Sequence, residues 1–231
     1  MNFFWIKAFT TLGPSLIEGI RVVVNVTIFG FAAALIMSLL LAIGRMSKNK
    51  TFNKVIVLFI ELIRGTPLLV QFFYIYYVIP MLGNGLFSLF GITTDIQIEP
   101  VVAGVIGFGI NYGCYMSEVI RSAIVAIDPG QREAGLALGY SEKQVLFKFI
   151  IPPAIRNSVP VFGNYLVMMI KDTSLLAMIS VQELLLRTKT FASQTFLTVE
   201  AYTLLALVYL VISVPLSRVS VVLEKRLKHR R

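Results

Sequence analysis

The chain has 231 residues, of which 57% are hydrophobic and 14% are charged, a balance typical of a small membrane protein. Its formal net charge of +9 does not indicate a nucleic-acid partner, because the basic residues lie beside apolar stretches, as membrane topology requires. With one cysteine, Cys114, and one histidine, His229, we expect no intrachain disulfide, no metal site and no catalytic triad.

The N-terminal residues 1–19 are apolar and aromatic, with a Gly13-Pro14 pair that should break a helix. They lack the basic start of a cleavable signal peptide, so they are expected to lie at the membrane interface. Five apolar stretches follow, each long enough to cross a bilayer as a helix. These predicted spans are about 22–44, 55–80, 101–127, 157–180 and 200–222.

Two predicted spans contain residues that disturb a helix. In the second, Gly65-Thr66-Pro67 should bend or loosen the helix, and Glu61 and Arg64, three residues apart, can pair. In the fourth, Pro160 and Gly163 interrupt the helix early, and Lys171-Asp172 interrupts it late.

The distribution of Lys and Arg predicts the orientation of the spans. Fourteen lie in the segments 45–54, 128–156 and 218–231, against four in 1–21, 81–99 and 183–199. Because cytoplasmic loops are rich in Lys and Arg, we expect the N-terminus outside and the C-terminus, with a basic tail at 223–231, in the cytoplasm. The sequence therefore predicts an all-α membrane protein, with one transmembrane domain over 1–231 and five transmembrane helices.

One long polar segment, 128–153, separates the third and fourth spans and contains the start and stop signals of two short helices. Asp128 is a good N-cap, and Gly139 can end the first helix in a left-handed conformation. Ser141 and Gln144 form a capping pattern for a second helix, which should end before Pro152-Pro153. This elbow can be an ordinary interfacial hairpin or a surface for a cytoplasmic partner. A DNA-reading helix-turn-helix is excluded because spans flank it.

The elbow resembles the coupling loop of bacterial ABC-importer permeases, written E-A-A-x3-G-x9-I-x-L-P. Three positions depart from that pattern: Gly135 for alanine, Phe149 for isoleucine and Ile151 for leucine. The resemblance implies that the elbow binds an ATPase subunit. The residues that carry this implied contact are Glu133, Ala134, Gly135, Gly139 and Pro152.

Three further segments are similar to permeases for polar amino acids, the histidine, glutamine and arginine group: ELIRGTPLLVQ at 61–71, NYGCYMSEVIRSAI at 111–124 and KDTSLL at 171–176. The resemblance implies a type I importer of the bacterial plasma (inner) membrane that carries polar amino acids. Its expected parts are two permeases, identical or paralogous, two ATPase subunits, and an extracellular or periplasmic solute-binding protein.

In that assembly this chain is a transport subunit and not an enzyme. It has no G-x-x-x-x-G-K-[ST] phosphate loop, so ATP and Mg are expected on the partner ATPase and no cofactor on this chain. The first alternative is a small channel or ion-coupled carrier without an ATPase partner. The second is a membrane assembly protein that recruits a cytoplasmic partner through the elbow and transports nothing. The choice among cationic, amide, acidic and sulfur-containing amino acids stays open.

Polar residues inside the spans are candidates for a substrate pathway. Lys171 and Asp172 can bind substrate if the helix is broken near Thr173, or they can pair and fix the helix. Glu118 and Arg121 fit a structural ion pair near the elbow better than a substrate site. Met168-Met169 fits core packing better than an adaptable gate. The remaining candidates, which can hydrogen-bond a substrate or a neighbouring helix, are Tyr115, Asn111 and, more weakly, Thr66 and Gln71.

Overall fold

The computed structural model describes residues 2–47 and 49–228, and all regular elements within them are helical. His229 and the last residues of the expected basic tail lie outside this part. The elements are α1 (Asn2–Gly44), α2 (Lys50–Arg64), α3 (Leu68–Phe73), the π-helix η1 (Tyr74–Val78), α4 (Ile79–Leu89), α5 (Pro100–Val125), α6 (Pro129–Ala137), α7 (Glu142–Val145), the π-helix η2 (Leu146–Ile150), α8 (Ile151–Asp172), the 3₁₀-helix η3 (Thr173–Ile179), α9 (Leu184–Thr195) and α10 (Thr198–Lys228).

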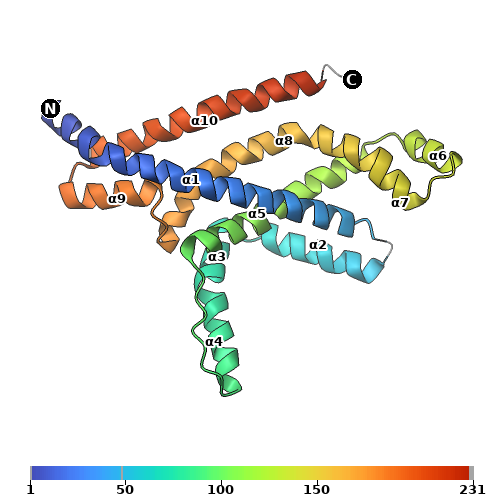
Figure 1. The fold of residues 1–231 in the computed structure, drawn as a ribbon, viewed down its shortest axis with the longest axis horizontal. Coiled ribbons are helices and arrows are strands. Elements are labelled where there is room, and N and C mark those ends of the chain that lie inside the picture. Colours follow the sequence, from blue (N-terminus) through green and yellow to red (C-terminus); the bar gives the residue numbers. More distant parts are fainter. Residues whose placement is uncertain (1, 48, 229–231) are drawn as a thin grey trace.

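The long helices α1, α2, α5, α8 and α10 extend along the length of the molecule (Figure 1). Figure 1 also shows the α1–α2 connection and the elbow at one end, with the N-terminus and α9 at the other. The pair α3 and α4 leaves this direction and projects away from the other helices. The loop after α4 runs back along it and is held by Asn84, whose side chain accepts from Ile96 N at 2.7 Å.

Small residues allow α1 and α5 to pack closely along their length. A Cβ added to Gly109 would lie 2.9 Å from Ala33 Cβ, and one added to Gly113 would lie 2.7 Å from Met37 Cβ. Such contacts bring two backbones together where lipid supplies no hydrophobic driving force.

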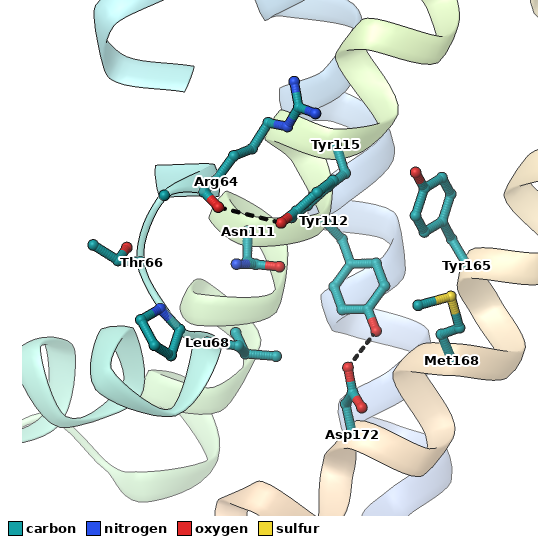
Figure 2. Close-up of a pocket in the computed structure, with 11 residues that line it drawn as sticks. Arg64, Thr66, Leu68, Asn111, Tyr112, Tyr115, Tyr165, Met168 and Asp172 are labelled. Atoms are coloured by element: carbon teal, nitrogen blue, oxygen red, sulfur yellow. Dashed lines mark hydrogen bonds between the residues drawn. The ribbon is translucent and has the colours of Figure 1, made fainter. Parts of the chain in front are cut away.

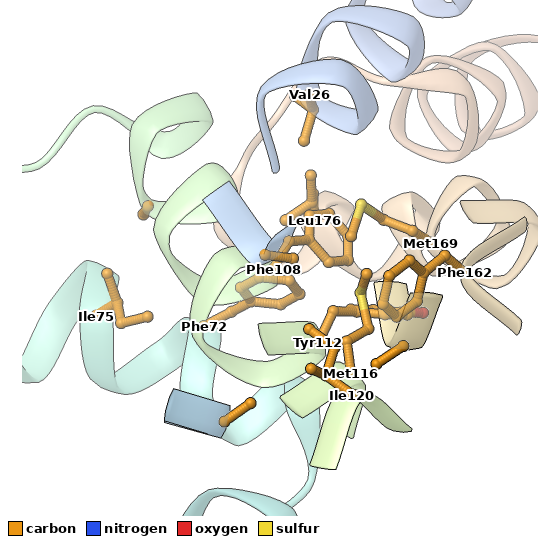
Figure 3. Close-up of a cluster of buried hydrophobic side chains, with 14 of the residues drawn as sticks. Val26, Phe72, Ile75, Phe108, Tyr112, Met116, Ile120, Phe162, Met169 and Leu176 are labelled. Atoms are coloured by element: carbon orange, nitrogen blue, oxygen red, sulfur yellow. The ribbon is translucent and has the colours of Figure 1, made fainter. Parts of the chain in front are cut away.

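The main core lies where α1, α3, α5, α8 and η3 meet (Figure 3). The Phe72 and Phe108 rings meet edge to face with centroids 5.1 Å apart. Met116, Met169 and Leu176 are fully buried in the same cluster. This packing fixes α5 and α8 on either side of the pocket described below.

The expected helix break at Gly13-Pro14 is wrong, because α1 continues through both residues. Pro14 lies on the exposed face of α1, away from the packed side chains. The opposite face carries Ala8, Leu12 and Leu16, all buried against residues of α9 and α10. Their spacing of four residues keeps one continuous helix packed.

Two expected interruptions around the fourth span are also wrong. The elbow's second helix does not end before Pro152-Pro153, because α7 passes through the wider turn of η2 directly into α8. Both prolines lie in the first turn of α8, directly after the wider turn of η2, which is a common place for such an irregularity in a continuous helix. Pro160 lies inside α8, which continues past Gly163 to Asp172.

Among the described residues, four helical stretches are long and apolar enough to cross a membrane: Phe4–Gly44, Leu68–Leu89, Glu142–Ile179 and Thr198–Val222. The predicted second span, 55–80, is displaced because the helix breaks at Gly65-Thr66-Pro67, as the sequence indicated. The predicted third span coincides with α5, whose glycines and polar residues lower its hydropathy. The segment 183–199, which precedes the last predicted span, folds largely as α9 (Leu184–Thr195).

Candidate functional site

A pocket of about 470 Å³ opens where the broken second helix faces α5 and α8 (Figure 2). The break contributes one wall, and polar side chains of α5 and α8 contribute the others. The lining residues are Arg64, Gly65, Thr66, Pro67, Leu68, Asn111, Tyr112, Tyr115, Tyr165, Met168 and Asp172.

The break between α2 and α3 exists because Pro67 adopts an extended backbone and has no N–H for a continuous helix. The carbonyls that the break frees are bound by the buried side chain of Gln71. Its Nε2 donates to Ile63 O at 2.7 Å and to Thr66 O at 3.1 Å. Asn111 of α5 then donates from Nδ2 to Gln71 Oε1 at 3.0 Å. Gln71 therefore lies behind Asn111 and stabilises the wall of the pocket from inside the protein.

Asp172 ends α8 and forms the opposite wall. Its Oδ2 accepts a hydrogen bond from the Tyr112 hydroxyl at 2.7 Å. The helix changes from α to 3₁₀ at Thr173, where the sequence predicted a break. Thr173 itself is fully buried and donates to Ile170 O, so it does not line the pocket.

Lys171 and Asp172 do not form an ion pair in the described part of the chain. Lys171 is exposed and lies outside the pocket lining. The two methionines also separate, since Met168 lines the pocket and Met169 is buried in the core. Each split follows from the helical turn between successive residues.

The third wall combines Arg64 and Tyr115. The expected pairing of Glu61 with Arg64 is absent from the ion pairs of the described residues. The Arg64 guanidinium instead lies over the Tyr115 ring, 5.1 Å from its centroid. The Tyr115 hydroxyl donates to Arg64 O at 3.4 Å.

Glu118 and Arg121 form the expected structural ion pair, with Arg121 Nε donating to Glu118 Oε1 at 3.0 Å. A second guanidinium, from Arg45 at the end of α1, also binds Glu118. This cluster joins α1 to the elbow end of α5 and lies outside the pocket lining. The sequence pattern missed Arg45 because 73 positions separate it from Glu118.

Several pocket residues were not among the predicted substrate-pathway residues, including Arg64, Tyr112, Tyr165 and Met168. Arg64 lies inside the segment 61–71 and Tyr112 inside 111–124, so their motifs contained the signal. Tyr165 has no such signal, because its place depends on how α8 packs against α5. Met168 was assigned to core packing.

The caps of the elbow and its turn at Gly139 have the predicted local structure. Asp128 Oδ1 accepts from Gly130 N at 2.8 Å, and Ser141 and Gln144 form a reciprocal capping box. Gly139 adopts a φ of +83°, which favours glycine. Gly135 is buried against Val145, so it permits the two short helices to pack together.

The outer surface of the elbow is mixed in character. Arg132 of α6 forms an ion pair with Glu142 of α7 at 2.5 Å, and the Glu142 carboxylate raises the pKa of the Arg132 guanidinium. Glu133, Ala134 and Pro152 are exposed, and so are the large side chains of Leu138 and Phe147, at 75% and 53%. An apolar surface of this kind, bordered by charges, is typical of a protein contact.

Within residues 2–47 and 49–228, no three His, Cys, Asp or Glu side chains gather in a way that could hold a metal ion. The polar groups of the pocket are thus Arg64, Asp172, amide groups and hydroxyls. These can hold a small polar or charged molecule by hydrogen bonds and ion pairs.

The chain is similar to known transport proteins over nearly its whole length. It is 36% identical over 228 residues, 99% of both chains, to the glutamine transport system permease protein GlnP of Escherichia coli (strain K12). It is 37% identical over 215 residues to the L-cystine transport system permease protein TcyB of Bacillus subtilis (strain 168), covering 93% of this chain and 87% of that one.

Solved structures agree with this relationship. A crystal structure of an amino acid ABC transporter with histidines matches with a TM-score of 0.79 and 32% identity, covering 95% of this chain and 97% of that chain. The inward-facing MetNI methionine ABC transporter shares the fold, with a TM-score of 0.62 at 16% identity over 92% and 95% of the two chains. The family described as binding-protein-dependent transport system inner membrane component matches residues 14–229. The chain belongs to this family and is the membrane-spanning permease subunit of an ABC importer, in which ATP hydrolysis belongs to a partner ATPase.

Proposed function

We propose that this permease carries polar amino acids into the cell and that the pocket between α2, α5 and α8 is their binding site within the membrane. The observation that carries the proposal is the pocket's composition. It joins an acid, a base, an amide and three tyrosines in a volume of about 470 Å³. A molecule with both an ammonium and a carboxylate suits such a set of groups. The glutamine and cystine permeases among its relatives support the same substrate class.

The crossings of this permease are α1, α5, α8, α10 and the second span, which is broken between α2 and α3 and continues through η1 into α4. Five crossings place the N-terminus outside and the C-terminus in the cytoplasm, in agreement with the distribution of Lys and Arg. With this topology the elbow lies in the cytoplasm. The arrangement in Figure 1, with the elbow and the N-terminus at opposite ends, supports this orientation.

The elbow couples the pocket to ATP hydrolysis. Exposed Glu133 and Ala134 of α6, together with Leu138 and Pro152, form the surface for an ATPase subunit. Gly135 and Gly139 act inside the elbow, by close packing and by a left-handed turn. Two ATPase subunits, a second permease and an external solute-binding protein complete the complex. Alternating access then follows from rigid-body movement of the two elbows.

Proteoliposomes containing the permease and its ATPase test this function. With its solute-binding protein outside and ATP inside, we expect labelled glutamine, cystine, histidine or arginine to accumulate in the lumen. Vesicles loaded with ADP are the control. Equal uptake with ADP would exclude an ATP-driven importer, and no uptake of any polar amino acid would exclude the proposed substrate class.

A further inference from the structure

The hydrogen bonds behind the pocket decide which way the buried amide of Asn111 faces. Asn111 is 6% exposed and lies between Gln71 on one side and the pocket on the other. An amide presents a donor at one end and an acceptor at the other, so its orientation changes what a ligand meets.

The orientation follows from two groups that can only accept. Ile63 O and Thr66 O are backbone carbonyls, and both lie within 3.1 Å of the same end of the Gln71 side chain. That end must be Nε2, because an oxygen there would face two acceptors without a proton between them. Gln71 Oε1 therefore points at Asn111, and the Asn111 group facing it must be Nδ2, at 3.0 Å.

Asn111 Oδ1 is consequently left for the pocket. Figure 2 shows this oxygen on the side of Tyr112 and Asp172, and the amide nitrogen on the side of the break. Among the hydrogen bonds of the described residues, none reaches Asn111 Oδ1, and it is not a buried unpaired atom. It is therefore accessible to a ligand in the pocket.

The opposite wall presents acceptors as well. The Tyr112 hydroxyl proton is used by Asp172 Oδ2, which leaves Asp172 Oδ1 for a ligand. The Tyr115 hydroxyl proton points to Arg64 O. The pocket is thus lined by acceptor oxygens of Asn111 and Asp172, and that of Asp172 is charged. An ammonium group has three donors and no acceptor, so it matches this arrangement.

We propose that Gln71 is a positioning residue that fixes the Asn111 amide, so that Asn111 Oδ1 and Asp172 together form an ammonium subsite. The ligand class is a primary amine, here the α-ammonium of an amino acid, and the inference rests on the proposed function. Gln71 acts through Asn111 and does not line the pocket itself.

Equilibrium dialysis on the purified permease–ATPase complex, without solute-binding protein, tests the proposal. A mixture of the twenty ¹⁴C-labelled amino acids first identifies the one that binds most tightly. Its unlabelled form and its 2-oxo acid, in which a carbonyl replaces the ammonium, then compete for the same site. In the wild type we expect the 2-oxo acid to compete at least about tenfold more weakly, the scale of one charge-assisted hydrogen bond.

Gln71→Met removes the amide but keeps the length of the side chain. The Asn111 amide can then turn and offer Nδ2 to a carbonyl, so the preference for the amine should fall about tenfold. Asn84→Ala is the matched control, because Asn84 also pins a loop through its amide but lies outside the pocket. It should leave the preference unchanged. This ratio of affinities would not respond to a merely structural role of Gln71.

The outcomes are separable. If the complex binds no amino acid, the proposed function fails and the subsite falls with it. If an amino acid binds but Gln71→Met keeps the wild-type preference, only the positioning role is overturned. Should Gln71→Met fail to assemble with the ATPase, Asn111→Leu removes the amide directly, and an unchanged preference there would refute the subsite.

Discussion

Asp172 and its sequence neighbour Lys171 show how one residue step separates a pocket group from a surface group. Asp172 lines the pocket and accepts a hydrogen bond from Tyr112, whereas Lys171 is exposed outside it. The sequence could place both residues within a motif, but it could not predict which of the two side chains lines the pocket. The same holds for Asn111 and Gln71, since only the packed structure shows that one lines the pocket and the other lies behind it.

At this residue scale, Asp172→Asn removes the negative charge of the side chain and keeps its shape. The Tyr112 hydroxyl can still donate to the amide oxygen, so the pocket should keep its form while losing its negative charge. We expect ATP-driven uptake of a polar amino acid to fall about tenfold or more, because a hydrogen bond to a charged group contributes about 1.5–3 kcal/mol. Copurification with the ATPase should be unaffected.

Asp95→Asn provides the matched control for this charge removal. Asp95 is exposed in the loop after α4, where its carboxylate accepts from Gln97. Uptake by this variant should equal that of the wild type. Wild-type uptake by Asp172→Asn as well would remove Asp172 from the binding site.

At the scale of elements, proline and glycine predicted some boundaries and failed at others. Gly65-Thr66-Pro67 does break a helix at Pro67, and Gln71 stabilises the break by binding the carbonyls that it frees. Gly13-Pro14 and Pro160 do not, since packing holds α1 and α8 continuous through them. The local sequence reports where a helix can end, but the partner that stabilises the end comes from tertiary structure. The caps of the elbow were predicted correctly because they are local, whereas the predicted end of its second helix was wrong.

Gly139 gives a prediction for the elbow itself. Its φ of +83° is strained for any side chain and most of all for a β-branched one, so Gly139→Val should distort the turn between α6 and α7. We expect the variant to reach the membrane. In a gentle-detergent pulldown it should recover less than about a third of the ATPase that the wild type recovers, because the strained turn weakens ATPase binding by about 1 kcal/mol.

Ala137→Val is a suitable comparison, because Ala137 is exposed in the helical conformation at the end of α6. It adds the same side chain without the strained backbone and should recover the ATPase normally. If both variants recovered it equally, the left-handed turn would not be required for coupling.

At the scale of the whole molecule, the sequence predicted an all-helical membrane chain and the order of its motifs, but not how distant segments meet. The cluster of Arg45, Glu118 and Arg121 joins the end of α1 to α5, and no local pattern links its first member to the others. The pocket likewise depends on three segments that lie far apart in the chain. What joins them is the packing of α5 against α1 on one face and α8 on the other.

That packing yields a prediction for the stability of the whole fold. A side chain at Gly113 must displace Met37 and the backbone of α1, so Gly113→Val should destabilise the permease by about 1–3 kcal/mol, the usual cost of overpacking. Gly85→Val adds the same side chain in α4, where a Cβ meets nothing within 4 Å. In detergent, we expect Gly113→Val to lower the thermal midpoint measured by the loss of monodisperse protein, and Gly85→Val to change it little. Equal midpoints would mean that α1 and α5 can separate without loss of the fold. The close packing of these two helices would then have to serve movement during transport rather than stability.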